Sequence, residues 1–422
     1  MSASLDFLPE VAAAPRPKDW VSLRAGAEAQ LEDKGYPAPK AEDWKYTDLA
    51  PLKALAPKPG AHACVDIRGH ILPESRGARL VFVNGHYDPH YSNISGLPPG
   101  VRMLQLSTAS EAAAALGTLA TPETCDVFAN LNTAKFEDGA FIYVPKGLQV
   151  EPVLHVCFMG APDGGQATCA HPRLLVVLEK GAELHLVEEY SGQGSYFTNA
   201  LTEVIVKDGA ELRHERIQLE SPEAIHLSHL RAQVGRSARY FSRTVSFGAR
   251  LSRQSPHVVL ADEGAELHLD GLALLDGQQV ADTHSIIDHT QAHCSSHQLH
   301  KAIGDGQSRI VFNGKIFVRP GAQQTDAQQQ SRNLLLSEKA RVDTKPELQI
   351  LADDVKCAHG AAIGQLDPEE LFYLQSRGLD LNAAKNLLTY GFAAELLSRI
   401  PVPSLRKHLR QLVMERTNAL TM

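Results

Sequence analysis

The sequence predicts a mainly β protein whose core is a parallel β-helix or a related solenoid, flanked by N-terminal and C-terminal helical regions. Three observations support this fold class. A charged-Gly-Ala-Glu-Leu pattern recurs in KGAELHLVEEY (180–190), DGAELRHERIQ (208–218) and EGAELHLDGLA (263–273). No clear hairpin turn separates the copies, and the residues after about 363 have helical spacing.

Residues 1–136 form the first predicted region, which is mixed and largely helical. Residues 1 to about 60 combine Ala, Leu, Lys and Glu with many prolines, as expected of short helices separated by irregular segments. RLVFVNGHYDP (79–89) places an Asn84-Gly85 turn after an apolar strand, which predicts a hairpin. EAAAALGTLA (111–120) and CDVFANLNTAKF (125–136) return to helix-like spacing.

Residues 137–362 form the predicted β-helix core. The glycines of the three copies stand at 181, 209 and 264, so the second interval is close to twice the first. Such a period indicates stacked coils, in which inward side chains such as Leu184 and Leu186 are buried by the coils on either side. A two-sheet β-sandwich is the main alternative, because it also contains many short strands. The regular period favours the solenoid.

Residues 363–422 form the predicted C-terminal helical region. Asp367 is an N-cap candidate, Pro368 suits the first helical position, and Glu369 and Glu370 suit the first turn. This helix should end near Gly378. A last helix is predicted in SLRKHLRQLVMER (404–416).

The middle helix of this region is predicted from about Leu381 to Arg399. Its expected apolar face contains Ala384, Leu387, Leu388, Gly391 and Ala394, and its expected polar face contains Asn382, Lys385, Asn386 and Thr389. Such a face either packs on its own domain or binds a groove of a partner protein.

Composition limits the classes of function. The chain has 422 residues, 43% of them hydrophobic, and a net charge of −8, which favours a soluble globular protein and argues against binding to nucleic acid. The N-terminus lacks a signal-peptide pattern and no apolar run reaches about 18 residues, so we expect a cytoplasmic protein that does not enter the membrane. The six cysteines form no CxxC pair, so most should be small buried side chains.

Catalytic motifs are missing from the sequence. It contains no GxxxxGK[ST], GxSxG, HExxH or EF-hand pattern, and GDGQS (304–308) should be a turn followed by a strand. We therefore predict no catalytic residues and no nucleotide hydrolysis by a P-loop of this chain.

The segment THSIIDHTQAHCSSHQLHK (283–301) is rich in histidine. On a helix, His289, His293, His297 and His300 would form a metal-binding stripe, but the segment lies in the β region. We interpret it as a polar coil of the solenoid. The glutamine-rich AQQTDAQQQ (322–330) is likewise interpreted as stacked amides or a solvated face.

The stretch DDVKCAHGAAIGQLDPEE (353–370) holds the candidate metal ligands. In a strand, Cys357 and His359 project from the same face. This geometry offers a metal one thiolate and one imidazole. It equally suits a small buried thiol beside a histidine at the end of a sheet, and the spacing alone does not separate the two.

The same stretch carries a family resemblance. TKPELQILADDVKCAHGAAIGQLDPEELFYLQSRGL (344–379) closely resembles the signature of the SufB/SufD family of iron–sulfur cluster assembly proteins, and within it the SufD branch. KAEDWKYTDL (40–49), RLVFVNGHYDP (79–89), SSHQLHKAI (295–303) and GQSRIVFNG (306–314) agree with it in the same order.

The resemblance implies a right-handed parallel β-helix in a non-catalytic scaffold subunit of an ATPase-containing complex. The partners implied are the paralogue SufB, through the β-helix, and two copies of the ABC-type ATPase SufC, through residues 363–422. The cargo would be a nascent iron–sulfur cluster near the SufB interface, with sulfur delivered by a cysteine desulfurase. A reduced flavin at the level of the complex and a homodimer without SufB remain open.

The family's functional histidine falls on His359 in Cys357-Ala358-His359-Gly360, so the resemblance makes His359 a candidate iron ligand. Cys357 is the weaker candidate, and Gly360 should let the chain leave the β-helix.

Two other classes of protein also have a β-solenoid. One is the polysaccharide lyases, which are usually secreted, whereas this chain lacks a signal-peptide pattern. The other is a self-associating structural solenoid, which needs no helical docking segment after its last coil.

Overall fold

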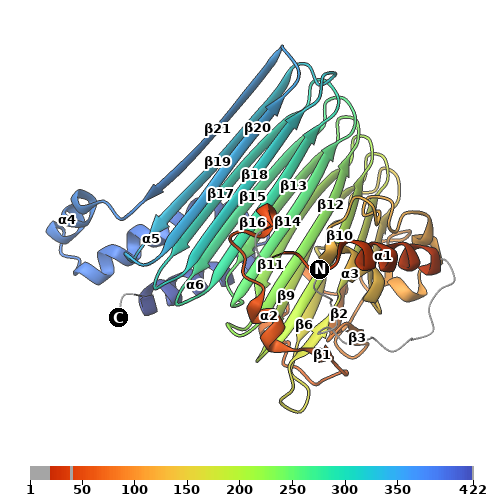
Figure 1. Cartoon of the computed structure of the whole chain (residues 1–422), viewed down its shortest axis with the longest axis horizontal. Helices are drawn as coiled ribbons and strands as arrows, with labels where there is room; N and C mark the ends of the chain where they lie inside the picture. Colours follow the sequence, from red (N-terminus) through yellow and green to blue (C-terminus); the bar gives the residue numbers. More distant parts are fainter. Residues whose placement is uncertain (1–19, 39–40, 421–422) are drawn as a thin grey trace.

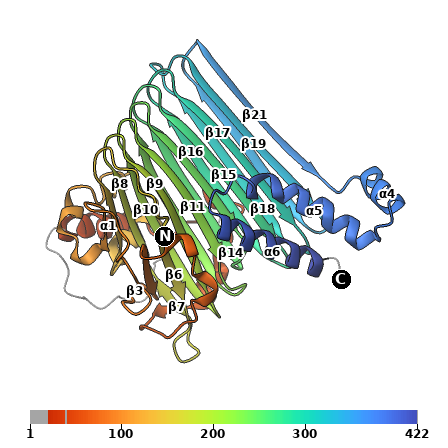
Figure 2. The ribbon, with the colours of Figure 1, turned by 180° about the vertical axis from the view of Figure 1, so that it is seen from behind.

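The computed structural model describes residues 20–38 and 41–420, and its core is a solenoid of about 7 turns built from two long sheets (Figures 1 and 2). Successive strands alternate between the sheets, so each strand pairs with the strand one coil away. All long neighbours pair in parallel, as Phe197↔Ile225 and Ile225↔Leu251 illustrate. Parallel pairing excludes the β-sandwich, whose strands are antiparallel, and confirms the predicted solenoid.

The first sheet has its strands in the spatial order β20 (Arg341–Ile350), β18 (Arg309–Val318), β16 (Val280–His289), β14 (Leu251–Leu260), β12 (Ile225–Val234), β10 (Tyr196–Val206), β8 (Arg173–Leu178), β5 (Gly139–Val144) and β4 (Arg102–Gln105). In addition, β7 (Thr168–Ala170) pairs with β10, and β1 (Lys58–Pro59) pairs with β7. The second sheet runs β21 (Val355–Gly364), β19 (Thr325–Leu335), β17 (Ser295–Gly304), β15 (Glu266–Leu275), β13 (Arg239–Ser246), β11 (Glu211–Leu219), β9 (Glu183–Gly192), β6 (Leu154–Gly160), β2 (Arg79–Val83) and β3 (His86–Tyr87).

One recurrent turn explains the glycine period and its gap. The turn before β9, β11 and β15 holds a residue with positive φ, and the same turn recurs before β13, β17 and β19, where no glycine occupies it. The residues are Gly181, Gly209, Ser237, Gly264, His293 and Gln324, with φ of 68°, 66°, 50°, 72°, 60° and 56°. Ser237 is therefore the copy that the glycine pattern skipped, and the backbone keeps the turn at a small conformational cost.

The N-terminal part covers one end of the solenoid with α1 (Val21–Lys34), α2 (Ala50–Leu55), α3 (Val127–Lys135) and five 3₁₀ helices (Figure 1). The 3₁₀ helices are η2 (Glu42–Trp44), η3 (Arg68–His70), η4 (Pro73–Ser75), η5 (Leu106–Thr108) and η6 (Ser110–Ala114). The Asn84-Gly85 hairpin is confirmed, because β2 and β3 are antiparallel and both turn residues have positive φ. Residues 111–120 contain most of η6 but no α-helix, and Gly117 with φ 77° prevents a longer helix.

The C-terminal helices are α4 (Pro368–Ser376), α5 (Leu381–Leu397) and α6 (Pro403–Leu420). Asp367 caps α4 by accepting from the Glu369 backbone N–H, and Gly378 follows the helix with φ 96°, as predicted. Helices α5 and α6 cross the outer face of the second sheet, whereas α4 projects beyond it (Figure 2).

The predicted apolar face of α5 was partly wrong. Ala384 is buried as expected, but Leu387 is 48% exposed and Thr389 is buried at 2%. The buried side instead continues through Ala393, Leu396 and Leu397, which pack with the outer face of the second sheet and with α6. The helix has apolar residues on more than one side, so its own periodicity does not decide which side the solenoid covers.

We predict that acid destabilises the fold, because the folded chain buries the imidazoles of His171 and His289. Burial, with Lys135 and Arg24 nearby, lowers the pKa of His171 to about 3, and burial lowers the pKa of His289 to about 4. The ordinary value is 6.5, so the unfolded chain binds more protons between these limits. Their contribution to stability is present above pH 6.5 and lost as the pH falls, by up to about 1.4 kcal/mol per unit for each histidine.

Urea unfolding at pH 7.5 and pH 5.5 measures this loss. His289→Gln should reduce the difference between the free energies of unfolding at the two pH values. An identical pH dependence in the wild type and His289→Gln would remove His289 from this account.

Candidate functional site

The predicted ligands Cys357 and His359 lie on β21, the last strand of the second sheet and its free edge (Figure 1). Their register neighbours on β19 are Ala327 and Gln329. Both neighbours are buried, whereas Gln328 between them is exposed. Cys357 and His359 therefore lie on the strand face that points between the two sheets. Among the described residues, no further coil stacks on the outer side of the coil that contains them.

The two side chains differ in their surroundings. Cys357 is half-buried and packs against the main apolar core, and burial raises the pKa of its thiol. His359 is exposed and lies in an open groove of about 330 Å³ lined by residues 328–332 and 358–362. His359 is thus accessible to a partner or an ion, whereas Cys357 fits the packing role that the sequence left open.

The inner space behind His359 is polar. Buried Gln329 donates from Nε2 to Gln298 Oε1 at 2.8 Å, and Gln298 donates from Nε2 to Ser285 Oγ at 2.8 Å. Gln329 Oε1 has no hydrogen-bond partner among the residues that the structure describes. The buried amide side chains of Gln329 and Gln298 therefore lie behind the exposed imidazole of His359. For Gln329, this agrees with the interpretation of residues 322–330 as stacked amides.

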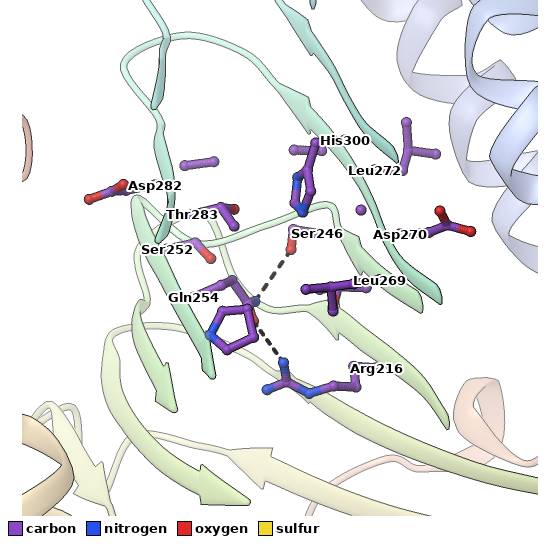
Figure 3. Close-up of a pocket in the computed structure, with 15 residues that line it drawn as sticks. Arg216, Ser246, Ser252, Gln254, Leu269, Asp270, Leu272, Asp282, Thr283 and His300 are labelled. Carbon is purple, nitrogen blue, oxygen red and sulfur yellow. Dashed lines mark hydrogen bonds between the residues drawn. The ribbon is translucent and has the colours of Figure 1, made fainter. Parts of the chain in front are cut away.

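The polar interior continues deeper into the solenoid, where Arg216, Gln254 and His300 line a small cavity of about 30 Å³ (Figure 3). Gln254 accepts from Arg216 at 3.3 Å. Burial alone would raise the pKa of Glu188, but Arg216 and His214 hold it below its usual range. These charges compensate one another, so this interior cluster presents no free acid or base.

The histidine-rich segment does not form a joint metal site. A turn separates β16 from β17, which puts His289 and His297 on different sheets. His289 is buried against Ser296 Oγ at 2.8 Å, and the ring of His297 lies 5.2 Å from that of His268. The ring of His300 packs on Phe312. The polar-coil interpretation accounts for this segment.

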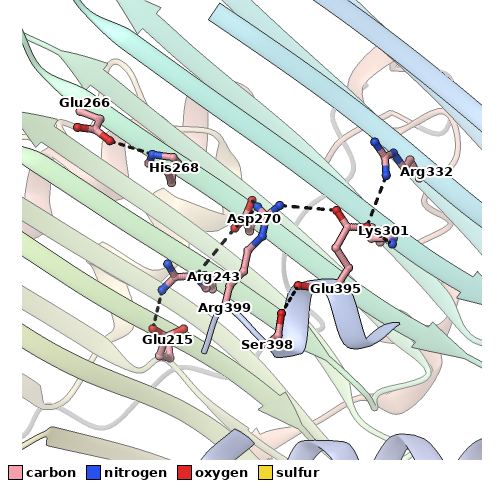
Figure 4. A network of polar contacts seen from close by, with 10 residues as sticks. All are labelled: Glu215, Arg243, Glu266, His268, Asp270, Lys301, Arg332, Glu395, Ser398 and Arg399. Carbon is pink, nitrogen blue, oxygen red and sulfur yellow. Dashed lines mark hydrogen bonds and ion pairs between the residues drawn. The ribbon is translucent and has the colours of Figure 1, made fainter. Parts of the chain in front are cut away.

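An ionic network fastens α5 to the outer face of the second sheet (Figure 4). Arg399 bonds Asp270 on β15 at 3.1 Å, and Glu395 bonds Lys301 on β17 at 2.7 Å and Arg332 on β19 at 3.5 Å. Because β19 pairs with β21, the network connects the C-terminal helices to the strand beside His359. The sequence did not predict these contacts, which join residues 63 to 129 positions apart.

A second group of metal-ligand side chains was also missed. His155-Val156-Cys157 has the same alternate spacing as Cys357-Ala358-His359, and its partner Glu189 lies on the neighbouring strand β9. The spacing alone was the available signal, and the register that adds Glu189 could not be read from it.

Two family models match the chain. The SufBD core domain of the SUF system for iron–sulfur cluster assembly matches residues 160–392, more than half of the chain, and the SufBD protein N-terminal region matches residues 71–156. The first covers most of the solenoid together with α4 and much of α5.

Similar proteins agree with these models. An iron–sulfur cluster assembly SufBD family protein of Synechocystis is 38% identical over 94% of this chain and 91% of its own length. The iron–sulfur cluster assembly protein SufD of Escherichia coli is 32% identical over 90% of this chain and 89% of its own, and the chloroplastic protein ABCI7 of Arabidopsis thaliana is 31% identical over 92% and 84%.

Proposed function

Because the chain belongs to the SufBD family of iron–sulfur cluster assembly proteins, we propose that it is a non-catalytic scaffold subunit of a SufBCD complex. In this proposal the chain pairs with a SufB paralogue, docks the SufC ATPase and places His359 beside the nascent cluster. Its place of action would be the cytoplasm. No helix of the described chain combines the length and apolarity that crossing a bilayer requires.

The observation that supports the pairing is the open end of the solenoid. β20 and β21 are the edge strands of their sheets and have no paired neighbour on the outer side within the described residues. Exposed parallel edges of this length bind readily to strands of another chain. A paralogue that stacks its own coil there would cover His359 and complete the groove with ligands of its own.

A neutral imidazole is a suitable ligand for iron, and an exposed one is free to bind it transiently. A single histidine and a half-buried thiol are too few for stable binding of a cluster. We therefore assign the remaining ligands to the paralogue, with Cys357 as a structural neighbour or a minor contributor.

The observation that supports ATPase docking is the apolar surface of α4 and α5. Phe372 is 73% exposed, Tyr373 57% and Leu387 48%, although all three are large side chains. Exposed aromatic residues on a projecting helix are typical anchors of a protein interface. The Arg399–Asp270 and Glu395–Lys301 contacts would then carry motion of these helices into the solenoid.

Phe372→Asp should abolish copurification of the ATPase while leaving the free chain as stable as the wild type. The exposed ring contributes little to the fold, but an anchor of an interface typically contributes at least about 2 kcal/mol to binding. Ile94→Asp is the matched control, since Ile94 is also exposed at 40% but lies in the N-terminal part. Equal ATPase recovery with Phe372→Asp and the wild type would refute docking at α4.

The iron and sulfide content of the purified complex tests the proposed scaffold function. The chain, a SufB paralogue and the ATPase are coexpressed and purified without oxygen, and iron and acid-labile sulfide are measured. We expect both elements in the three-component complex and neither above background in the chain alone. A complex that forms but remains free of iron and sulfide after incubation with a cysteine desulfurase, cysteine and ferrous iron would contradict the proposal.

A further inference from the structure

His155, Cys157 and Glu189 form the one group of three or more metal-ligand side chains that converge in the described part of the chain. His155 Nε2, Cys157 Sγ and a carboxylate oxygen of Glu189 all lie within 4.8 Å of one another. His155 and Cys157 share one face of β6, and Cys157 is the register partner of Glu189 on β9. The strand pairing therefore fixes all three positions.

The group lies on the outer face of the second sheet, beneath the N-terminal segment. Cys157 packs with Ile67 and Val81 in a small apolar cluster, which separates it from the main core. His70, at the end of η3, contacts the second oxygen of Glu189, with Nδ1 2.5 Å from Oε1. All of these side chains are buried except that of His70, which is 23% exposed.

Hydrogen bonds satisfy the imidazole and the carboxylate of this group but pair the thiol only weakly. His155 Nε2 lies 2.9 Å from Glu189 Oε2 and 3.1 Å from Cys157 Sγ, which is farther from Nδ1 at 3.7 Å. If Nε2 carries the proton and donates to the carboxylate, the thiol has only the long contact to Nδ1 at 3.7 Å as an acceptor in this group. If Nε2 accepts from the thiol, its lone pair faces the carboxylate oxygen across 2.9 Å.

A divalent cation would pair all three groups at once. One thiolate and one carboxylate balance two positive charges, and the neutral imidazole adds a third ligand, so the buried site would carry no net charge. Mixed nitrogen, sulfur and oxygen ligands suit zinc or ferrous iron, with bonds of about 2.0–2.3 Å. The observed separations of 2.9 and 3.1 Å need only a small expansion to admit the ion.

We propose that His155, Cys157 and Glu189 bind a zinc-class divalent transition metal, with His70 positioning the carboxylate and a fourth coordination position open to water. Binding replaces the thiol proton of Cys157, which is released to solvent, and forms one metal–sulfur bond. The metal would also fasten the N-terminal segment to the first coils. This site is separate from His359, on the other side of many intervening coils.

Cobalt(II) titration of the metal-free full chain tests the proposal, because a cobalt–thiolate bond gives a charge-transfer absorption that oxygen and nitrogen ligands do not. We expect one equivalent of Co²⁺ to develop this band and Zn²⁺ to remove it. Cys157→Ser should abolish the band, whereas Cys357→Ser and Cys294→Ser should retain it. His70→Ala should keep the band but weaken Co²⁺ binding by about 10–100-fold, as loss of a positioning partner does.

Absence of the band in the wild-type chain would overturn the proposal without reference to any variant. A band lost in Cys357→Ser and kept in Cys157→Ser would also overturn it and place the metal at the edge strand. If Cys157→Ser does not fold, Glu189→Gln, which preserves shape, replaces it: unchanged Co²⁺ affinity would contradict the assignment.

Discussion

His359→Ala is expected to abolish accumulation of iron and sulfide on the assembled complex while leaving the complex itself intact. The imidazole is exposed on the free edge of the second sheet, so its loss should change the stability of the chain by no more than about 0.5 kcal/mol. In the proposed complex, the same imidazole is an iron ligand beside the paralogue. The measurement is iron and acid-labile sulfide per complex, with size-exclusion chromatography to confirm assembly.

His297→Ala is the matched control for this prediction. His297 belongs to the same sheet, but its register partner is the exposed Gln328, so it faces outward rather than between the sheets. It should behave as the wild type. Wild-type levels of iron and sulfide in His359→Ala would show that His359 does not belong to the site. Failure of this variant to form the complex would instead assign His359 to the interface with the paralogue.

The largest effect on stability is expected from Glu203→Ala, at about 3–5 kcal/mol. Glu203 and Arg173 form an ion pair in which both side chains are fully buried. Glu203 also accepts backbone N–H groups of Gly117, Leu119 and Ala120, and Arg173 donates to Thr133 in α3 at 3.0 Å. Removing the carboxylate leaves a buried guanidinium without its counter-charge.

Tryptophan fluorescence during urea unfolding measures this effect. The chain has two tryptophans, Trp20 and Trp44, and both are buried in the N-terminal part that the ion pair fastens. Arg236→Ala is the control, because Arg236 pairs with Asp262 and Glu263 at the surface, where solvent screens the charges, and its loss should change the unfolding midpoint little. Equal unfolding midpoints for Glu203→Ala and Arg236→Ala would show that the buried pair does not hold this region.

The solenoid could be predicted because its coils repeat in the sequence. Each coil needs the same turn and the same alternation, and both leave local signals, such as the glycines at 181, 209 and 264. The coils at Ser237, His293 and Gln324 were missed because residues other than glycine also adopt the left-handed turn there. The helix caps at Asp367 and Gly378 were readable for the same reason: they act within a few residues.

Contacts between coils and across layers could not be predicted in this way. The pairing of Arg173 with Glu203, and of Cys157 with Glu189, depends on strand register, which sets neighbours about thirty residues apart. The buried side of α5 depends on the sheet beneath it, so periodicity favoured Leu387 where the structure buries Thr389. Alternate spacing correctly predicted that Cys357 and His359 share one strand face, but it did not predict that His359 is exposed and Cys357 half-buried.

The most direct test of the scaffold proposal is recovery of the tagged chain from a lysate of its own host under gentle, oxygen-free conditions. Mass spectrometry then identifies what remains bound. The account predicts an ABC-type ATPase together with a β-solenoid paralogue. Recovery of the chain alone or only with itself, under conditions that preserve other complexes, would contradict the account and favour a self-associating solenoid.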